Sequence, residues 1–190
     1  DRIVILKSAR SMTLLSGGKV LKTYKVALGS VPVGPKRVEG DHQTPEGSYI
    51  VDAKNPHSRF HLSLHISYPS AADQQCARSM GARPGGAIMI HGLARPFAYL
   101  GPLHRQRDWT DGCISVTNAE IEEIYGSWFP WEQESRFGLS FSRAASKIFL
   151  FVKDFSEQHS ITDVAEKAPQ IFSTRIFAFS KNIFERTFNF

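Results

Sequence analysis

Two short segments, IMIHG at residues 88–92 and DWTDGCISVTN at residues 108–118, decide how this 190-residue chain is interpreted. The apolar residues that precede His91 are typical of a buried strand, which would deliver the imidazole at its end. In the second segment Gly112 comes directly before Cys113 and predicts a sharp turn. The sequence therefore places a histidine and a cysteine where the chain leaves regular structure.

This pair of residues has the composition of a nucleophilic site. A thiol near its ordinary pKa is mostly protonated at neutral pH, and a neighbouring imidazole can take the proton to give the nucleophilic thiolate. Gly112 would leave backbone N–H groups free to face the oxygen of a reacting carbonyl. A buried structural residue is the simpler interpretation of either His91 or Cys113 alone. The two together, each beside a glycine, predict a cysteine acyl-transfer site.

The residues before the site predict a mainly β chain. Gly17-Gly18 lies between two strand-like runs, as in a β-hairpin. The stretch 31–47 is rich in proline and glycine but also carries mixed charge, which indicates an ordered loop rather than a linker. Strands are expected at 2–7, 12–15, 20–28, 48–53, 60–68 and 87–90.

One helix is expected after the cysteine. Thr117 and Glu120 have capping-box spacing, and Ile121, Ile124 and Tyr125 then share one helical face. The fold class is therefore α+β, mainly β, with a short helix after the nucleophile.

Positive charge gathers between the histidine and the cysteine. Between residues 78 and 107 there are no acidic residues and five arginines: Arg78, Arg83, Arg95, Arg105 and Arg107. Such charge would lower the pKa of the thiol and would bind carboxylates in a bidentate manner. The net charge of +5 also suits nucleic acid. However, no nucleic-acid-binding motif is present, so we expect an anionic substrate and no nucleic-acid partner.

Three histidines offer an alternative metal site. His57, His61 and His65 are spaced by four and would share a face on a helix. The alternation of HLSLHI at 61–66 favours an ordinary strand instead, so we expect neither a metal nor a cofactor. Cys76 lies in a polar stretch and is expected to be an idle thiol.

The two quoted segments resemble the signature of the L,D-transpeptidase catalytic domain family. That signature is a His-Gly pair, a spacer, Ser or Thr, a variable residue, Gly-Cys, and a nearby Asn or Asp. YKVALG, GPKRVEGDHQTPEGSY and SLHISYP resemble the flanking family pattern, so the match spans roughly residues 2–125. The fold that the resemblance implies is a curved β-sheet sandwich.

The resemblance also implies a two-step reaction on peptidoglycan. Cys113 would attack the carbonyl of the L-centre of diaminopimelate in a donor tetrapeptide stem and expel D-alanine, with His91 accepting and donating the proton. An amine of a second stem, or of a murein lipoprotein, would then resolve the thioester. Gly112 and Cys113 would supply backbone at the oxyanion site.

Other positions are carried over as substrate-binding residues. Many family members have a histidine where Asp111 stands and an arginine where Ser115 stands, the latter associated with the substrate carboxylate. We therefore expect one of the two nearby arginines to make that contact. The departures resemble a subgroup that includes enzymes removing lipoprotein from peptidoglycan, and they leave the acceptor open. The expected substrate-binding set is Gly92, Thr110, Asp111, Ser115, Asn118, Arg105 and Arg107.

The composition changes abruptly after Gly126. Of the fourteen phenylalanines, twelve lie between residues 129 and 190. We divide the chain into a catalytic domain, 1–126, and a Phe-rich tail, 127–190. The resembled family closes its domain with a segment like V-P-x-G-T-x-V-x-I-x-P. Codons for residues 128–139, regrouped by one base, can read V-P-L-G-T-R-I-E-I-R-P. We favour a frameshifted reading of this tail over a genuine extension.

Location and alternative functions follow from the same resemblance. The chain begins at Asp1 and has no apolar run long enough to span a membrane, so we expect a periplasmic or envelope protein exported with its signal peptide removed. The favoured function is a transpeptidase acting on peptidoglycan stem peptides. The alternatives are a hydrolase, in which water resolves the thioester, and a non-catalytic peptidoglycan-binding protein.

Overall fold

A computed structural model describes residues 2–127 and 148–153, and these form a mixed sheet with few helices. The sheet has eight strands in the order β3-β2-β1-β8-β4-β5-β6-β7. The mainly β class predicted from the sequence is confirmed. The strands are β1 (Arg2–Leu6), β2 (Ser11–Ser16), β3 (Lys19–Lys25), β4 (Gly47–Ser58), β5 (His61–Ile66), β6 (Met89–His91), β7 (Ile114–Ser115) and β8 (Ile148–Lys153).

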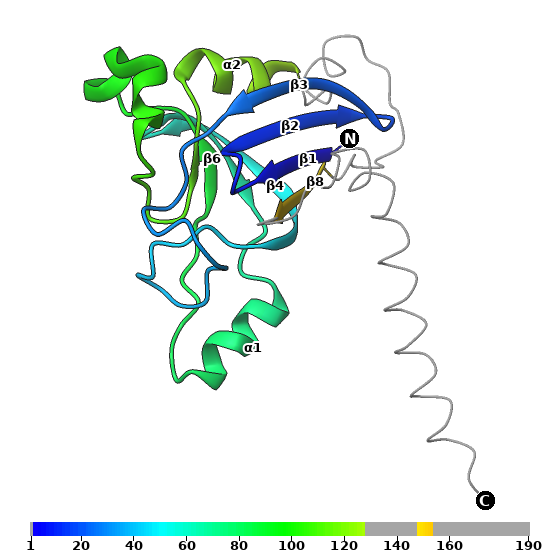
Figure 1. The fold of residues 1–190 in the computed structure, drawn as a ribbon, viewed down its shortest axis with the longest axis vertical. Helices are drawn as coiled ribbons and strands as arrows, with labels where there is room; N and C mark the ends of the chain where they lie inside the picture. The colour runs from blue at the N-terminus through cyan, green and yellow to red at the C-terminus, as the bar shows by residue number, and fades with distance from the viewer. Residues whose placement is uncertain (1, 128–147, 154–190) are drawn as a thin grey trace, which may run out of the picture. The chain divides into compact units, whose positions relative to one another are not determined.

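The first three strands form an antiparallel meander, seen as neighbouring blue arrows in Figure 1. Gly17 and Gly18, at the turn between β2 and β3, both have positive φ, at 55° and 81°. A tight turn of this kind matches the twist of the flanking strands and is accessible to consecutive glycines. The predicted hairpin is confirmed.

The centre of the sheet contains β8. This strand runs parallel to β1 and antiparallel to β4, and Figure 1 shows it in gold beside them. The sheet thus includes residues that the sequence division assigned to the tail. The rest of that tail, including the segment 128–139 to which the frameshift hypothesis applies, lies outside the described residues.

The two ends of the sheet meet. Beyond β3 the chain forms isolated bridges from Ala27 to Ser115 and from Gly29 to Thr110. The N–H of Ala27 donates to the carbonyl of Ser115 at 3.0 Å, and the reverse bond is 2.8 Å. The sheet therefore curls around one apolar core, and the residues before β7 lie where the curl closes.

The predicted helix after the cysteine is α2 (Asn118–Ser127). The N–H of Thr117 donates to Glu120 Oε2 at 2.9 Å, and the N–H of Glu120 donates to Thr117 Oγ1 at 3.3 Å. Ile121 and Ile124 are fully buried, with Tyr125 packed at the edge of the core. The capping box and the apolar face are both confirmed.

Two further helical segments were not predicted. They are α1 (Ala71–Ser79) and η1 (Arg95–Gln106), a 3-10 segment broken at Gly101. Along α1 only Ala77 is buried, so the sequence carries no apolar periodicity there. Cys76 is exposed on this helix.

The stretch 31–47 is an ordered loop, as predicted, and buried lysines hold it. Lys7 is 1% exposed and donates to Gly34 O at 2.5 Å, to Thr44 O at 3.0 Å and to Glu46 at 2.9 Å. Within the loop, Lys36 binds Asp41 at 2.8 Å. A buried ammonium needs such acceptors, so these contacts fix the loop against the start of the sheet.

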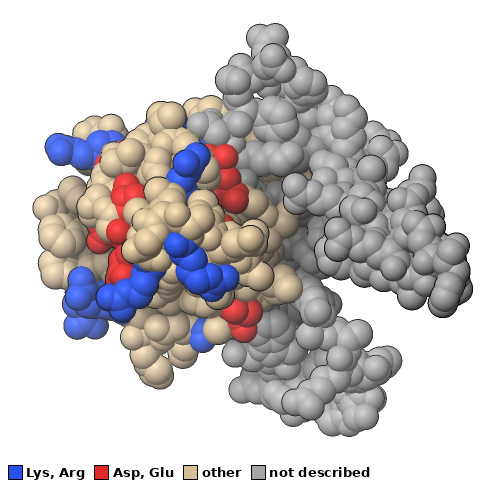
Figure 2. Space-filling model, turned by 90° about the horizontal axis from the view of Figure 1, so that it is seen from below, with Lys and Arg blue, Asp and Glu red and all other residues tan. Residues whose placement is uncertain are grey.

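Figure 2 shows lysine, arginine and acidic side chains interspersed over the described part of one face of the molecule. None of the helices within the described ranges combines the length and apolar character needed to cross a bilayer.

Candidate active site

Neighbouring strands bring together the cysteine and the histidine. β6 and β7 run parallel, with Ile90 opposite Ile114 and His91 opposite Ser115. The N–H of Val116 donates to the carbonyl of His91 at 2.9 Å. Cys113 therefore lies immediately before β7, beside the strand that ends at His91. Continued by one residue, the register places Cys113 opposite Met89, two positions from His91 on the adjacent strand.

The turn that presents the cysteine is built by Gly112 and Thr110. Gly112 has φ 120°, and a Cβ there would lie 2.6 Å from the carbonyl oxygen of Gln43. Thr110 Oγ1 donates to the carbonyl of Cys113 at 2.7 Å and accepts from the N–H of Gly112 at 3.2 Å. Thr110 thus fixes the turn, and the N–H expected from Gly112 at the oxyanion site is already donated inside it.

The pKa of the Cys113 thiol is raised above its ordinary value. Burial raises its pKa, the Asp111 carboxylate adds to the rise, and the N–H of Met89 and the charge of Lys36 oppose it. The sulfur donates to the carbonyl of Ala87 at 3.8 Å. The sequence predicted that the arginines lower this pKa; the pKa is instead raised, and Lys36 rather than an arginine is the cation that acts on the thiol. A general base is therefore required.

His91 is suited to be that base. Its side chain is buried, and Nδ1 lies 2.6 Å from the carbonyl oxygen of Gly92. A carbonyl only accepts, so Nδ1 carries the proton and Nε2 is free to take another. Burial lowers the imidazole pKa, and the bond to Gly92 partly offsets this. Among the described residues no hydrogen bond joins His91 to the sulfur of Cys113, as is common before substrate binds.

Asn118 holds the peptide group on which His91 depends. Asn118 Oδ1 accepts from the N–H of Leu93 at 2.6 Å. That N–H belongs to the same peptide as the Gly92 carbonyl bound by His91. A Cβ on Gly92 would lie 2.6 Å from Asn118 Oδ1, so the glycine permits this approach. Asn118, expected to bind substrate, is positioned here to orient the imidazole.

Two other residues expected to bind substrate are not available to it: Ser115 is buried, and Arg105 is ion-paired. Ser115 is 0% exposed, and its hydroxyl has no hydrogen-bond partner among the described residues. Arg105 is ion-paired with Glu120, the capping residue of α2. Arg107 is exposed and lines the pocket described next. Of these two arginines, Arg105 has a carboxylate partner within the described residues, and the contact of Arg107 with a substrate carboxylate stays a prediction.

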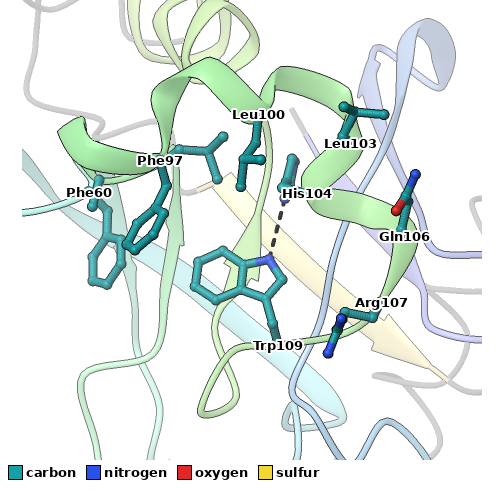
Figure 3. Close-up of a pocket in the computed structure, with 10 residues that line it drawn as sticks. Phe60, Phe97, Leu100, Leu103, His104, Gln106, Arg107 and Trp109 are labelled. Atoms are coloured by element: carbon teal, nitrogen blue, oxygen red, sulfur yellow. Dashed lines mark hydrogen bonds between the residues drawn. The ribbon is translucent and has the colours of Figure 1, made fainter.

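A pocket that the sequence did not predict lies beside His91. It has a volume of about 370 Å³ and is mostly apolar. Figure 3 shows Phe60 and Trp109 on one side, with Phe97 and Leu100 from η1 above them. The rings of Phe60 and Trp109 lie 4.5 and 6.0 Å from the His91 ring, centre to centre. Phe97 in the basic stretch and Trp109 just after it were the available signal in the sequence.

His104 supports one wall of this pocket. Its Nδ1 accepts from Trp109 Nε1 at 3.4 Å, the dashed line in Figure 3. Burial, and then the charge of Arg105, lower its pKa to about 4. His104 is therefore neutral at physiological pH and can act as the acceptor that this contact needs.

Two of the three histidines considered as an alternative metal site are paired with carboxylates. His61 binds Glu122 at 2.6 Å and His65 binds Asp52 at 2.5 Å. The strand predicted at 61–66 is confirmed as β5. Within residues 2–127 and 148–153, no three His, Cys, Asp or Glu side chains are grouped to hold a metal ion.

The curled mixed sheet carries a Gly-Cys turn beside the strand that ends at a buried histidine. The model of the L,D-transpeptidase catalytic domain (YkuD) matches residues 1–128. The chain belongs to this family, as its sequence resemblance predicted.

Comparisons with single proteins agree. The chain is 32% identical over 109 residues to "Putative L,D-transpeptidase YafK" of Escherichia coli K12, covering 56% of this chain and 37% of that protein. The fold is similar to the cell-shape-determining protein Pgp2 of Campylobacter jejuni, with a TM-score of 0.56, 22% identity, and 86% and 51% of the two chains covered. It is also similar to Bd1075 of Bdellovibrio bacteriovorus, with a TM-score of 0.53, 20% identity, and 92% and 54% covered. The chain thus spans about a third of the curated relative and about half of these structures.

Proposed function

We propose that this chain is a peptidoglycan acyltransferase of the L,D-transpeptidase type. The observation that carries the proposal is the placement of Cys113 and His91 on adjacent segments, where burial raises the pKa of the thiol and lowers that of the imidazole. The donor is a tetrapeptide stem, and the location is the periplasm or cell envelope.

The reaction has two steps. His91 Nε2 takes the thiol proton as Cys113 Sγ bonds to the carbonyl carbon of the L-centre of diaminopimelate. The carbon–nitrogen bond to D-alanine breaks, and the imidazolium returns the proton to the departing amine. In the second step an acceptor amine bonds to the same carbon, the carbon–sulfur bond breaks, and the thiolate is reprotonated. The acceptor is a second stem or a murein lipoprotein.

Incubation with disaccharide-tetrapeptide and mass spectrometry of the products tests this proposal. A cross-linked dimer with loss of D-alanine is expected. Tripeptide alone would instead identify water as the acceptor and the chain as a hydrolase. Binding to sacculi without loss of D-alanine would contradict both and indicate a non-catalytic peptidoglycan-binding protein.

A further inference from the structure

An exposed contact between a histidine and a carboxylate lies beside the nucleophile. His42 Nδ1 lies 2.7 Å from Asp111 Oδ1, although the two residues are 69 positions apart in the chain. The Asp111 side chain is 91% exposed and that of His42 is 49% exposed. Asp111 is separated from Cys113 only by Gly112. The pair therefore lies at the mouth of the candidate active site.

The backbone presents His42 rigidly. Its φ is 56°, and its carbonyl accepts from the N–H of Val31 at 3.1 Å. A Cβ on Gly29 would lie 2.2 Å from that carbonyl oxygen, so the two segments are in close contact. Next along the chain, the carbonyl of Gln43 packs against Gly112. The loop that carries His42 is thus fixed against the turn that carries Asp111.

Asp111 differs from the other carboxylates near the turn. Asp108 binds Arg10 and accepts from the N–H of Leu28. Asp41 binds Lys36 and three backbone N–H groups. Both are committed to holding loops in place. Asp111 has one oxygen on His42 and, within the described part of the chain, no contact at the other.

This carboxylate opposes the first chemical step, because its charge helps to raise the pKa of the thiol. The thiol of Cys113 must lose its proton for acylation, so acylation alone does not explain why a negatively charged Asp111 lies beside it. The second step has the opposite requirement. An amine acceptor arrives as an ammonium ion, and an exposed carboxylate close to the thioester attracts it and aligns it.

We propose that Asp111, oriented by His42, binds the ammonium group of the acceptor and so favours amines over water in the second step. This inference rests on the proposed function. The bound ammonium releases one proton to solvent at the exposed pair and attacks as the amine. A second proton passes through His91 to the departing sulfur, so the amide and the free thiol are restored. Asp111 is a specificity-determining residue for the acceptor and takes no part in forming the thioester.

The test separates the two steps in the full-length chain. Thioester formation is followed by intact-protein mass spectrometry with disaccharide-tetrapeptide, and its partition between cross-linking and hydrolysis is measured against acceptor concentration. The variants are Asp111→Asn and His42→Gln. The matched control is Asp52→Asn, which alters a similar exposed carboxylate–histidine pair on β4 and β5. Hydroxylamine, neutral at the assay pH, serves as the uncharged nucleophile.

We expect Asp111→Asn to raise the acceptor KM by roughly fivefold, the upper range for an exposed ion pair. Its hydrolysis fraction should rise, and thioester formation should not slow. His42→Gln should show a smaller shift in the same direction. Asp52→Asn and the reaction with hydroxylamine should be unchanged. If Asp111→Asn forms the thioester and divides it between cross-linking and hydrolysis as the wild-type chain does, this inference is overturned and the proposed function is not. Absence of any thioester in the wild-type chain overturns the proposed function and, with it, this inference.

Discussion

The bond between Asn118 and Leu93 offers a quantitative test of how the imidazole is held. In Asn118→Ala the N–H of Leu93, whose residue is 2% exposed, loses its acceptor at 2.6 Å. An unsatisfied buried donor costs about 1–3 kcal/mol. This is a large part of the roughly 5–15 kcal/mol that stabilises a domain of this kind.

Two further variants isolate that contribution. Asn118→Asp keeps an oxygen acceptor at the start of α2, where negative charge is favourable, so most of the stability should return. Asn55→Ala is the matched control, because Asn55 Oδ1 accepts from the N–H of His57 at an exposed site, where water can replace it. That change should cost less than about 0.5 kcal/mol.

Urea unfolding measures these differences as a shift of the midpoint at constant slope. Thioester formation should also slow in Asn118→Ala, since the peptide that binds His91 Nδ1 is no longer anchored. A midpoint shift in Asn118→Ala equal to that in Asn55→Ala, with an unchanged acylation rate, would refute the reasoning.

Three other predictions follow from the site and the tail. Because burial lowers the pKa of His91 and the base must be neutral, the acid limb of the kcat/KM profile should have its midpoint below 6.5, the ordinary value; a midpoint at or above that pH would count against His91 as the base. Gly112→Ala should lose at least tenfold in acylation rate, about 1.4 kcal/mol, because its φ of 120° and the nearby carbonyl oxygen exclude a side chain; near-normal kinetics would show that the turn is not needed. Nucleotide sequencing of the gene across codons 120–140 should reveal bases that regroup into the closing strand V-P-L-G-T-R-I-E-I-R-P; codons that cannot be regrouped would end the frameshift hypothesis.

Local patterns gave most of the correct fold predictions. Consecutive glycines marked the β2–β3 hairpin, alternation marked β5, and the spacing of Thr117 and Glu120 marked the start of α2. Each depends on neighbours in the chain, so the sequence alone is sufficient. The same applies to the Gly-Cys turn, where the glycine before Cys113 is required by its backbone conformation.

The features that the sequence did not predict depend on contacts between segments that are far apart in the chain. The contact between His42 and Asp111 depends on two distant loops meeting where the sheet closes. The raised thiol pKa depends on burial, which the arginines counted along the sequence could not indicate. The pocket beneath η1 is formed by a 3-10 segment with no clear periodicity and by aromatic residues from separate loops. Neither the polar surface of α1 nor the central position of β8 carried a local signal.

The central claim, that Cys113 carries the acyl group, is tested most directly by mapping the adduct. Wild-type chain, Cys113→Ala and Cys76→Ala are incubated with disaccharide-tetrapeptide, quenched in acid, digested and analysed by tandem mass spectrometry. We predict an adduct of the donor minus D-alanine on the peptide containing Cys113, retained in Cys76→Ala and lost in Cys113→Ala. An adduct on Cys76, or cross-linked product made by Cys113→Ala, would contradict it.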